Sequence, residues 1–141
     1  MPGFQYSFIH LTGEHRAYTR LPLLIQNPAT KLSAIVFGLV DTGADATLFP
    51  ATLAVRLGHK LKGKDVKTTV TGGIEQHPVV AYRHDFEVSL LTPDRRKIVW
   101  HDRMEIDCLE SDPPLLLGVD DFLRHFKLTI DYPSQTMRLS W

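Results

Sequence analysis

Apolar and polar side chains alternate along most of this 141-residue chain, and this period of two constrains the fold more than any other feature. The run over residues 79–91 is the clearest case, because one of its faces is apolar and the other is charged. The apolar face holds Val80, Tyr82, Phe86, Val88 and Leu90, and the charged face holds Arg83, Asp85 and Glu87. Alternation of this kind predicts strands with one buried face, and therefore a mostly-β fold.

Helical spacing is rare in the same sequence. Leu53 and Leu57 lie four apart between Pro50 and Gly58, which suit the two ends of a short helix. A second short helix is predicted over residues 120–125. Strands are predicted over residues 4–8, 17–26, 32–40, 66–71, 79–91, 98–109 and 115–117, then over about 126–132, and finally over a segment ending at Trp141.

Composition and charge exclude several classes of function. The chain has 16 Lys and Arg against 16 Asp and Glu, so neither nucleic acid nor a membrane surface finds an electrostatic attraction. The apolar run over residues 34–40 is too short to span a bilayer, and residues 1–4 lack the features of a signal peptide. The single cysteine, Cys108, excludes an internal disulfide. We therefore expect one domain over residues 1–141 and a cytoplasmic location.

The segment Asp41-Thr42-Gly43-Ala44 is the strongest functional candidate. It directly follows residues 35–40, an apolar run that predicts a buried strand. A carboxylate at the mouth of such a strand is costly unless it has a use, so Asp41 is a candidate catalytic group. The alternative is a structural role, in which Asp41 caps the turn that ends the strand.

Other reactive residue types form no comparable pattern. The chain has seven histidines, but spacings such as the one between His77 and His84 match no zinc site, so no metal is expected. The sequence contains neither a Gly-x-Ser-x-Gly segment nor a glycine-rich phosphate loop. Cys108 lies in an alternating apolar segment and is expected in the core rather than as a nucleophile.

Three motifs follow one another in a set order along the chain. They are Asp41-Thr42-Gly43-Ala44-Asp45, the candidate flap Val70-Thr71-Gly72-Gly73-Ile74, and Leu116-Leu117-Gly118. In this order they resemble the retroviral-type aspartic proteases, the single-lobed relatives of pepsin. The resemblance covers about residues 17–141 and leaves residues 1–16 as an N-terminal extension. It implies a single-lobed, β-barrel-like acid-protease fold with one or two short helices.

The resemblance also implies an activity and an assembly. Peptide hydrolysis by this route uses two carboxylates that share a proton, one activating water and the other donating to the substrate carbonyl. This chain contains a single Asp-Thr-Gly, so a second copy would supply the second carboxylate. The resemblance thus predicts a homodimer whose two Asp41 side chains meet at a twofold axis. Its other partner would be a peptide or protein substrate, with no cofactor.

The neighbours of Asp41 receive roles through the same resemblance. Thr42 would form a hydrogen bond across the twofold axis, and Gly43 would let the two backbones approach closely. Ala44 would leave space for an extended peptide, and Asp45 would bond to the main chain of that peptide.

The glycine-containing hairpin receives a role as well. Gly72, Gly73 and Ile74 would form part of a flap that closes over a peptide bound as an added β-strand. A plain hairpin turn is the alternative, and a flap needs the same turn.

One position departs from the retroviral pattern. Those enzymes usually carry Arg after the motif glycine, and this Arg pairs with the acidic residue that follows Asp-Thr-Gly-Ala. Here Val119 follows Gly118, so Asp45 lacks its expected partner, and Arg124 is the nearest substitute. A second hypothesis therefore stands beside the protease: a non-catalytic dimerisation or peptide-binding module on the same scaffold.

Overall fold

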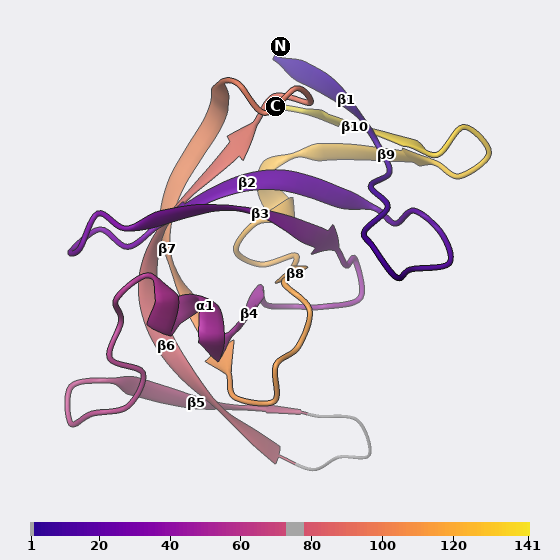
Figure 1. Ribbon diagram of the computed structural model, residues 1–141. Coiled ribbons are helices and arrows are strands. Elements are labelled where there is room, and N and C mark those ends of the chain that lie inside the picture. The colour runs from indigo at the N-terminus through magenta and orange to yellow at the C-terminus, as the bar shows by residue number, and fades with distance from the viewer. Residues whose placement is uncertain (1, 73–77) are drawn as a thin grey trace.

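The computed structural model describes residues 2–72 and 78–141, which fold mainly into β-strands (Figure 1). The strands are β1 (Gly3–Ser7), β2 (Arg20–Gln26), β3 (Ser33–Val40), β4 (Leu48–Pro50), β5 (Lys67–Gly72), β6 (Pro78–Leu91), β7 (Ile98–Leu109), β8 (Leu116–Leu117), β9 (Lys127–Asp131) and β10 (Thr136–Ser140). The helices are α1 (Ala51–Arg56) and the 3-10 turn η2 (Leu123–His125). The predicted mostly-β fold is therefore confirmed.

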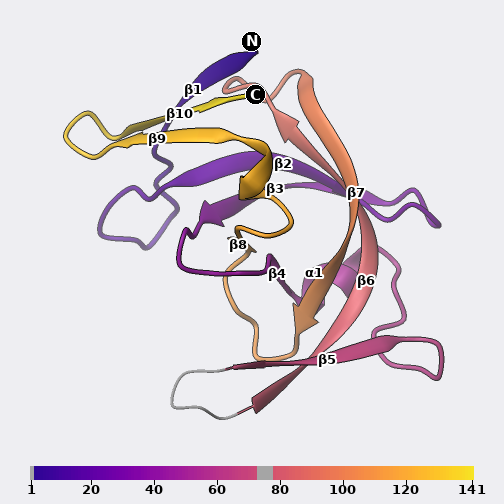
Figure 2. The same ribbon diagram turned by 180° about the vertical axis from the view of Figure 1, so that it is seen from behind.

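The larger of the two sheets closes into a ring. Its hydrogen-bonded neighbours follow the order β2, β3, β8, β4, β7 and β6, and β6 pairs again with β2 through residues 87–90 and 23–26. β5 pairs with β6 and lies outside the ring, as the two opposite views show (Figures 1 and 2). Closure pairs the strand edges around the ring, so the inward faces enclose a common core.

The inward face of β6 follows the predicted alternation. Phe86, Val88 and Leu90 are buried among side chains from the other ring strands. Val80 lies on the same face but is 48% exposed, because this end of β6 continues beyond the ring to pair with β5. The core is completed by residues that include Leu21, Leu23, Ile25, Phe49, Ile106 and Leu117.

The helix α1 has the ends that the sequence predicts. Pro50 occupies the position before its first residue, and Gly58 follows its last turn with a φ of +90°. Gly58 N–H donates to Val55 O (3.0 Å) and His59 N–H donates to Ala54 O (2.9 Å), which satisfies the final carbonyls. No helix in the described part of the chain is long and apolar enough to cross a bilayer.

Two elements differ from the prediction. The short strand β4 was not predicted, because it is held by pairing with β7 and β8 rather than by any alternation of its own. The second helix, predicted over residues 120–125, is only the 3-10 turn η2. The amides of Leu123 and Arg124 bond to Gly118 O and Val119 O, five residues back, and this arrangement does not propagate an α-helix.

The N-terminal segment is part of the fold. β1 pairs along its length with β10, which pairs on its other side with β9. The Tyr6 side chain enters the core with 2% exposure, and its hydroxyl donates to Leu91 O at the end of β6 (2.7 Å). Burial raises the pKa of this hydroxyl above its ordinary value. β1 therefore covers the edge of β10 and ties the smaller sheet to the ring.

Tyr6→Phe tests this tie. The variant keeps the buried ring but removes the hydrogen bond to the Leu91 carbonyl, so the free energy of unfolding should fall by about 1–2 kcal/mol. Urea denaturation followed by circular dichroism measures the change. Tyr132 is 64% exposed, and Tyr132→Phe is the matched control that should leave the midpoint unchanged. Equal midpoints for the two variants would show that the Tyr6 hydroxyl does not stabilise the fold.

Candidate active site

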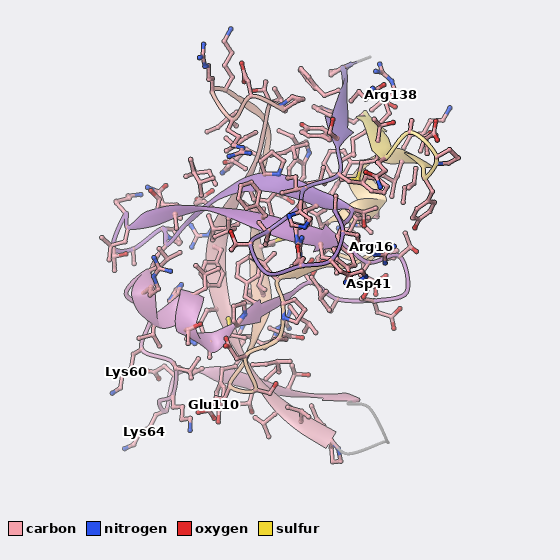
Figure 3. The ribbon with its side chains drawn as sticks, turned by 45° about the vertical axis from the view of Figure 1, so that its right-hand side comes forward. Arg16, Asp41, Lys60, Lys64, Glu110 and Arg138 are labelled. Atoms are coloured by element: carbon pink, nitrogen blue, oxygen red, sulfur yellow. The ribbon has the colours of Figure 1, made fainter. Side chains whose placement is uncertain are left out.

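Asp41 is the first residue after β3, and its carboxylate lies at the rim of the ring (Figure 3). Its N–H donates to Leu117 O in β8 (3.1 Å), so the parallel pairing of β3 with β8 sets where the side chain emerges. Gly43 N–H donates to Asp41 Oδ1 (3.0 Å), and Ala44 N–H donates to Asp41 O (3.2 Å). Asp41 therefore caps its turn, and Oδ2 accepts no hydrogen bond from the described residues.

Thr42 and Gly43 form the exposed tip of this turn. A Cβ atom on Gly43 would meet Asp41 Oδ1 at 3.4 Å, which is ordinary contact. Nothing within the described chain thus requires a glycine here. The predicted role of Gly43, which is to let the backbone of a second copy approach closely, stays a prediction.

The segment after the turn lies against the segment that leaves β8. Val119 N–H donates to Ala44 O (2.9 Å), and Asp120 N–H donates to Asp45 O (2.8 Å). These bonds bring the first and third sequence motifs together, a contact that the sequence analysis did not predict. The position of Asp41 therefore depends on both segments.

Thr47 links the segment that follows Asp41 to the segment that follows β8. It is 1% exposed, and its hydroxyl donates to Asp121 Oδ1 (2.6 Å) while accepting from Gly118 N–H (3.0 Å). Asp121 Oδ2 also accepts from Thr47 N–H (3.0 Å). Neither residue was singled out from the sequence, because the two stand 74 positions apart and no local pattern marks their contact.

Gly118 permits the closest contact in this region. A Cβ atom at this position would lie 2.3 Å from the Ala46 carbonyl carbon and 2.8 Å from Thr47 N. The clash would be with backbone, which cannot rotate away as a side chain can. The motif glycine is therefore required by the packing of the two segments.

Asp45 is exposed and has no ion-pair partner within residues 2–72 and 78–141. The expectation that Arg124 substitutes for the missing arginine is wrong for this single chain, since no ion pair joins Arg124 to Asp45 among those residues. Arg124 instead continues the turn after Gly118, where its N–H bonds to Val119 O (3.0 Å). Asp45 is thus left available for a ligand or a second chain.

The predicted hairpin is present, with Gly72 opposite Pro78 at its described end. Gly73 and Ile74, the remaining candidate flap residues, lie outside the described residues. Val70 and Val80 face each other across the two strands, and both are largely exposed. Figures 1 and 2 show β5 and the adjoining end of β6 extending past the ring.

Other catalytic chemistries find little support in the described part of the chain. No three His, Cys, Asp or Glu side chains gather there in an arrangement that could hold a metal. Burial raises the pKa of the Cys108 thiol to about 12, so the thiolate needed for nucleophilic attack is scarce at neutral pH. Cys108 is a core residue, as the alternation predicts.

A retropepsin-like aspartic protease from Rickettsia conorii, solved as a crystal structure, resembles this chain with a TM-score of 0.58. The alignment covers 98% of this chain and 90% of that protein, at 16% sequence identity. The fold is retropepsin-like. The resemblance drawn from the three motifs is thus confirmed at the level of the fold, and the retropepsin-like similarity extends into residues 1–16.

EIAV protease complexed with the inhibitor HBY-793 is a second similar structure, with a TM-score of 0.46 and 19% identity. That alignment covers 79% of this chain and 89% of the EIAV protein. No protein-family model and no curated protein sequence matches the chain. The retropepsin-like assignment therefore rests on three-dimensional structure.

Gly118→Ala tests the contact beneath Asp41. The added methyl group would overlap the Ala46 backbone, so the free energy of unfolding should fall by about 2–3 kcal/mol. Gly63→Ala is the control, because its Cβ would meet no atom closer than 3.8 Å. Urea denaturation of both variants gives the comparison. Equal stability would mean that the two segments are not held in close contact.

Proposed function

We propose that this chain is an aspartic endopeptidase that acts as a homodimer. The observation that carries the proposal is the setting of Asp41: one carboxylate oxygen is fixed by Gly43 N–H, and the other accepts no hydrogen bond from the described residues. A carboxylate held in this way is oriented for chemistry and still open to a ligand. The retropepsin-like fold adds support, because the similar protein from Rickettsia conorii is described as an aspartic protease.

The chemistry needs two such carboxylates. Two carboxylates a few ångströms apart cannot both ionise readily, so they hold one proton between them and titrate as a coupled pair. The ionised Asp41 takes a proton from water, whose oxygen attacks the peptide carbonyl carbon. The protonated Asp41 of the second copy donates to the carbonyl oxygen, and the tetrahedral intermediate then collapses with proton transfer to the leaving nitrogen. Asp41 from each copy is the catalytic residue.

The substrate is an extended peptide that binds as an added strand. Asp45 accepts hydrogen bonds from the peptide main chain, and its exposure and its lack of an ion-pair partner in the described chain support this role. The hairpin of β5 and β6 covers the peptide, with Val70 and Val80 as apolar contacts. Closure of this hairpin excludes water from the reacting carbonyl.

Asp41→Asn tests the proposal. Asn retains the oxygen that accepts from Gly43 N–H but cannot act as a base, so peptide cleavage should fall by about 10³-fold or more. Cleavage of a mixed peptide library by the purified protein, followed by mass spectrometry across acidic and neutral pH, measures the loss. Asp65→Asn is the control, since it removes the same charge from an exposed loop after α1.

A mixing experiment separates a dimeric enzyme from a monomeric one. Excess Asp41→Asn protein would form mixed dimers that contain one carboxylate, so it should suppress the activity of the wild-type protein. Excess Asp65→Asn protein should not suppress it. Undiminished cleavage by Asp41→Asn alone would remove Asp41 from the mechanism, and absence of suppression would argue against a shared site.

A peptide-binding or dimerisation module without catalysis is the second candidate function. Val119 in place of the expected arginine, together with the unpaired Asp45 side chain in the described chain, favours it, because the protease pattern is incomplete there. Such a module would bind extended peptides through the same hairpin and show no turnover.

A peptide carrying a statine-type hydroxyl, which mimics the tetrahedral intermediate, separates the two functions. A working pair of carboxylates should bind this mimic about 100-fold more tightly than the parent peptide, and Asp41→Asn should abolish the preference. Isothermal titration calorimetry measures both affinities. Equal affinity for mimic and parent peptide would favour the binding module.

A further inference from the structure

Residues 10–17 form a structured loop near the N-terminus. Reciprocal hydrogen bonds between Ile9 and Tyr18 (2.9 and 3.0 Å) close its base. Inside the loop, the Arg20 guanidinium binds both oxygens of Glu14 at 2.6 Å, and the same guanidinium donates to Ile9 O (3.1 Å). The hydrogen bonds from Arg20 lower the pKa of the Glu14 carboxyl to about 2, so this ion pair persists across the working range of most proteins. The loop therefore has a defined shape.

This loop is bonded to the strand that carries the candidate catalytic residue. Val40 N–H donates to Thr19 O (2.8 Å), and the Thr19 hydroxyl donates to Val40 O (3.4 Å). These bonds join the end of the loop to the residue immediately before Asp41. In the view of Figure 3, Arg16 and Asp41 lie at the same edge of the ring.

Arg16 is the second arginine close to Tyr18, and it makes no ion pair with any residue that the structure describes. Its guanidinium carbon lies 4.4 Å from the centre of the Tyr18 ring, and the Arg20 guanidinium lies 5.2 Å from the same ring. Arg20 forms an ion pair with Glu14, whereas Arg16 is exposed and makes no ion pair within residues 2–72 and 78–141. Stacking restricts a long side chain that is otherwise flexible, and the charge stays available to a ligand.

We propose that Arg16 is a specificity residue, which selects peptides carrying an acidic side chain close to the bond that is cut. The inference rests on the proposed peptidase function and names the substrate class that the site prefers. A planar guanidinium on a loop that is bonded to the segment carrying Asp41 suits a carboxylate, which it can bind through two parallel hydrogen bonds. Glu14 does not compete for this role, because Arg20 already occupies both of its oxygens.

The proposed assembly extends the preference to both sides of the cut bond. A twofold axis between two Asp41 side chains places one copy of the loop on each side of the bound peptide. Each half of the peptide therefore meets an Arg16. The same residue type should be preferred before and after the bond, with apolar residues at the bond itself.

Paired peptides test the proposal. One cleavable parent sequence is made with Glu, Gln or Lys at each of the three positions on either side of the cut bond, and kcat/KM is measured for each. Wild-type protein should prefer Glu over Gln by about fivefold at one position or more, as expected for an exposed ion pair. Arg16→Gln should abolish that ratio, and Arg16→Glu should reverse it in favour of Lys. A uniform loss on all peptides would overturn the assignment, because it would show a general effect on folding or assembly.

Arg138→Gln is the matched control. It removes the same charge from an exposed position on β10, far from Asp41 in Figure 3, and should leave the preference for Glu unchanged. A changed preference in this control would mean that overall charge, rather than Arg16, selects the peptide.

Peptide binding to the Asp41→Asn protein, measured by fluorescence anisotropy, separates this inference from the proposed function. Tighter binding of Glu peptides that depends on Arg16 would support the inference even if the wild-type protein cleaved nothing. Cleavage without a preference for Glu would overturn the inference and leave the peptidase standing. If no peptide is bound or cleaved, both proposals fail.

Discussion

The contact between Gly118 and the backbone of Ala46 and Thr47 is the constraint on which the candidate site depends. Two chain segments from different parts of the sequence meet there with no side chain between them. The Thr47 hydroxyl, donating to Asp121 and accepting from Gly118, fixes the same contact by hydrogen bonds. Asp41 N–H bonds to Leu117 O, one residue before this junction, so backbone packing fixes where its carboxylate emerges.

The closed ring gives that junction a rigid support. β3 delivers Asp41, β8 delivers Gly118, and β4 begins just after Thr47, so three neighbouring strands converge on one point. The hairpin of β5 and β6 differs, because it continues past the ring and lacks neighbours there. The carboxylate therefore lies over backbone that is paired on several sides, whereas β5 pairs only with β6 among the described strands.

Much of this arrangement could be predicted from local patterns. Alternation located most strands, and Leu53, Leu57 and Gly58 located α1, because each pattern reflects the burial of a nearby face. Asp41 and Gly118 were recognised from short local motifs, and for Gly118 the close contact with the Ala46 backbone explains the residue type. The contact of Thr47 with Asp121 could not be predicted, since it joins residues 74 positions apart and leaves no periodic trace. The anchoring of β1 by Tyr6 could not be predicted for the same reason, because the hydrogen bond from Tyr6 to Leu91 O spans 85 positions.

The two ends of the chain form a nearly continuous path. Trp141 N–H donates to Pro2 O (3.1 Å), and β1 and β10 are paired from there onward. A short peptide could join these ends, and the polypeptide could be reopened in the exposed loop around residues 62–64, which lies opposite Asp41 (Figure 3). Circular permutation would thus preserve the ring and its carboxylate while presenting new termini at a remote surface, suited to immobilisation or genetic fusion.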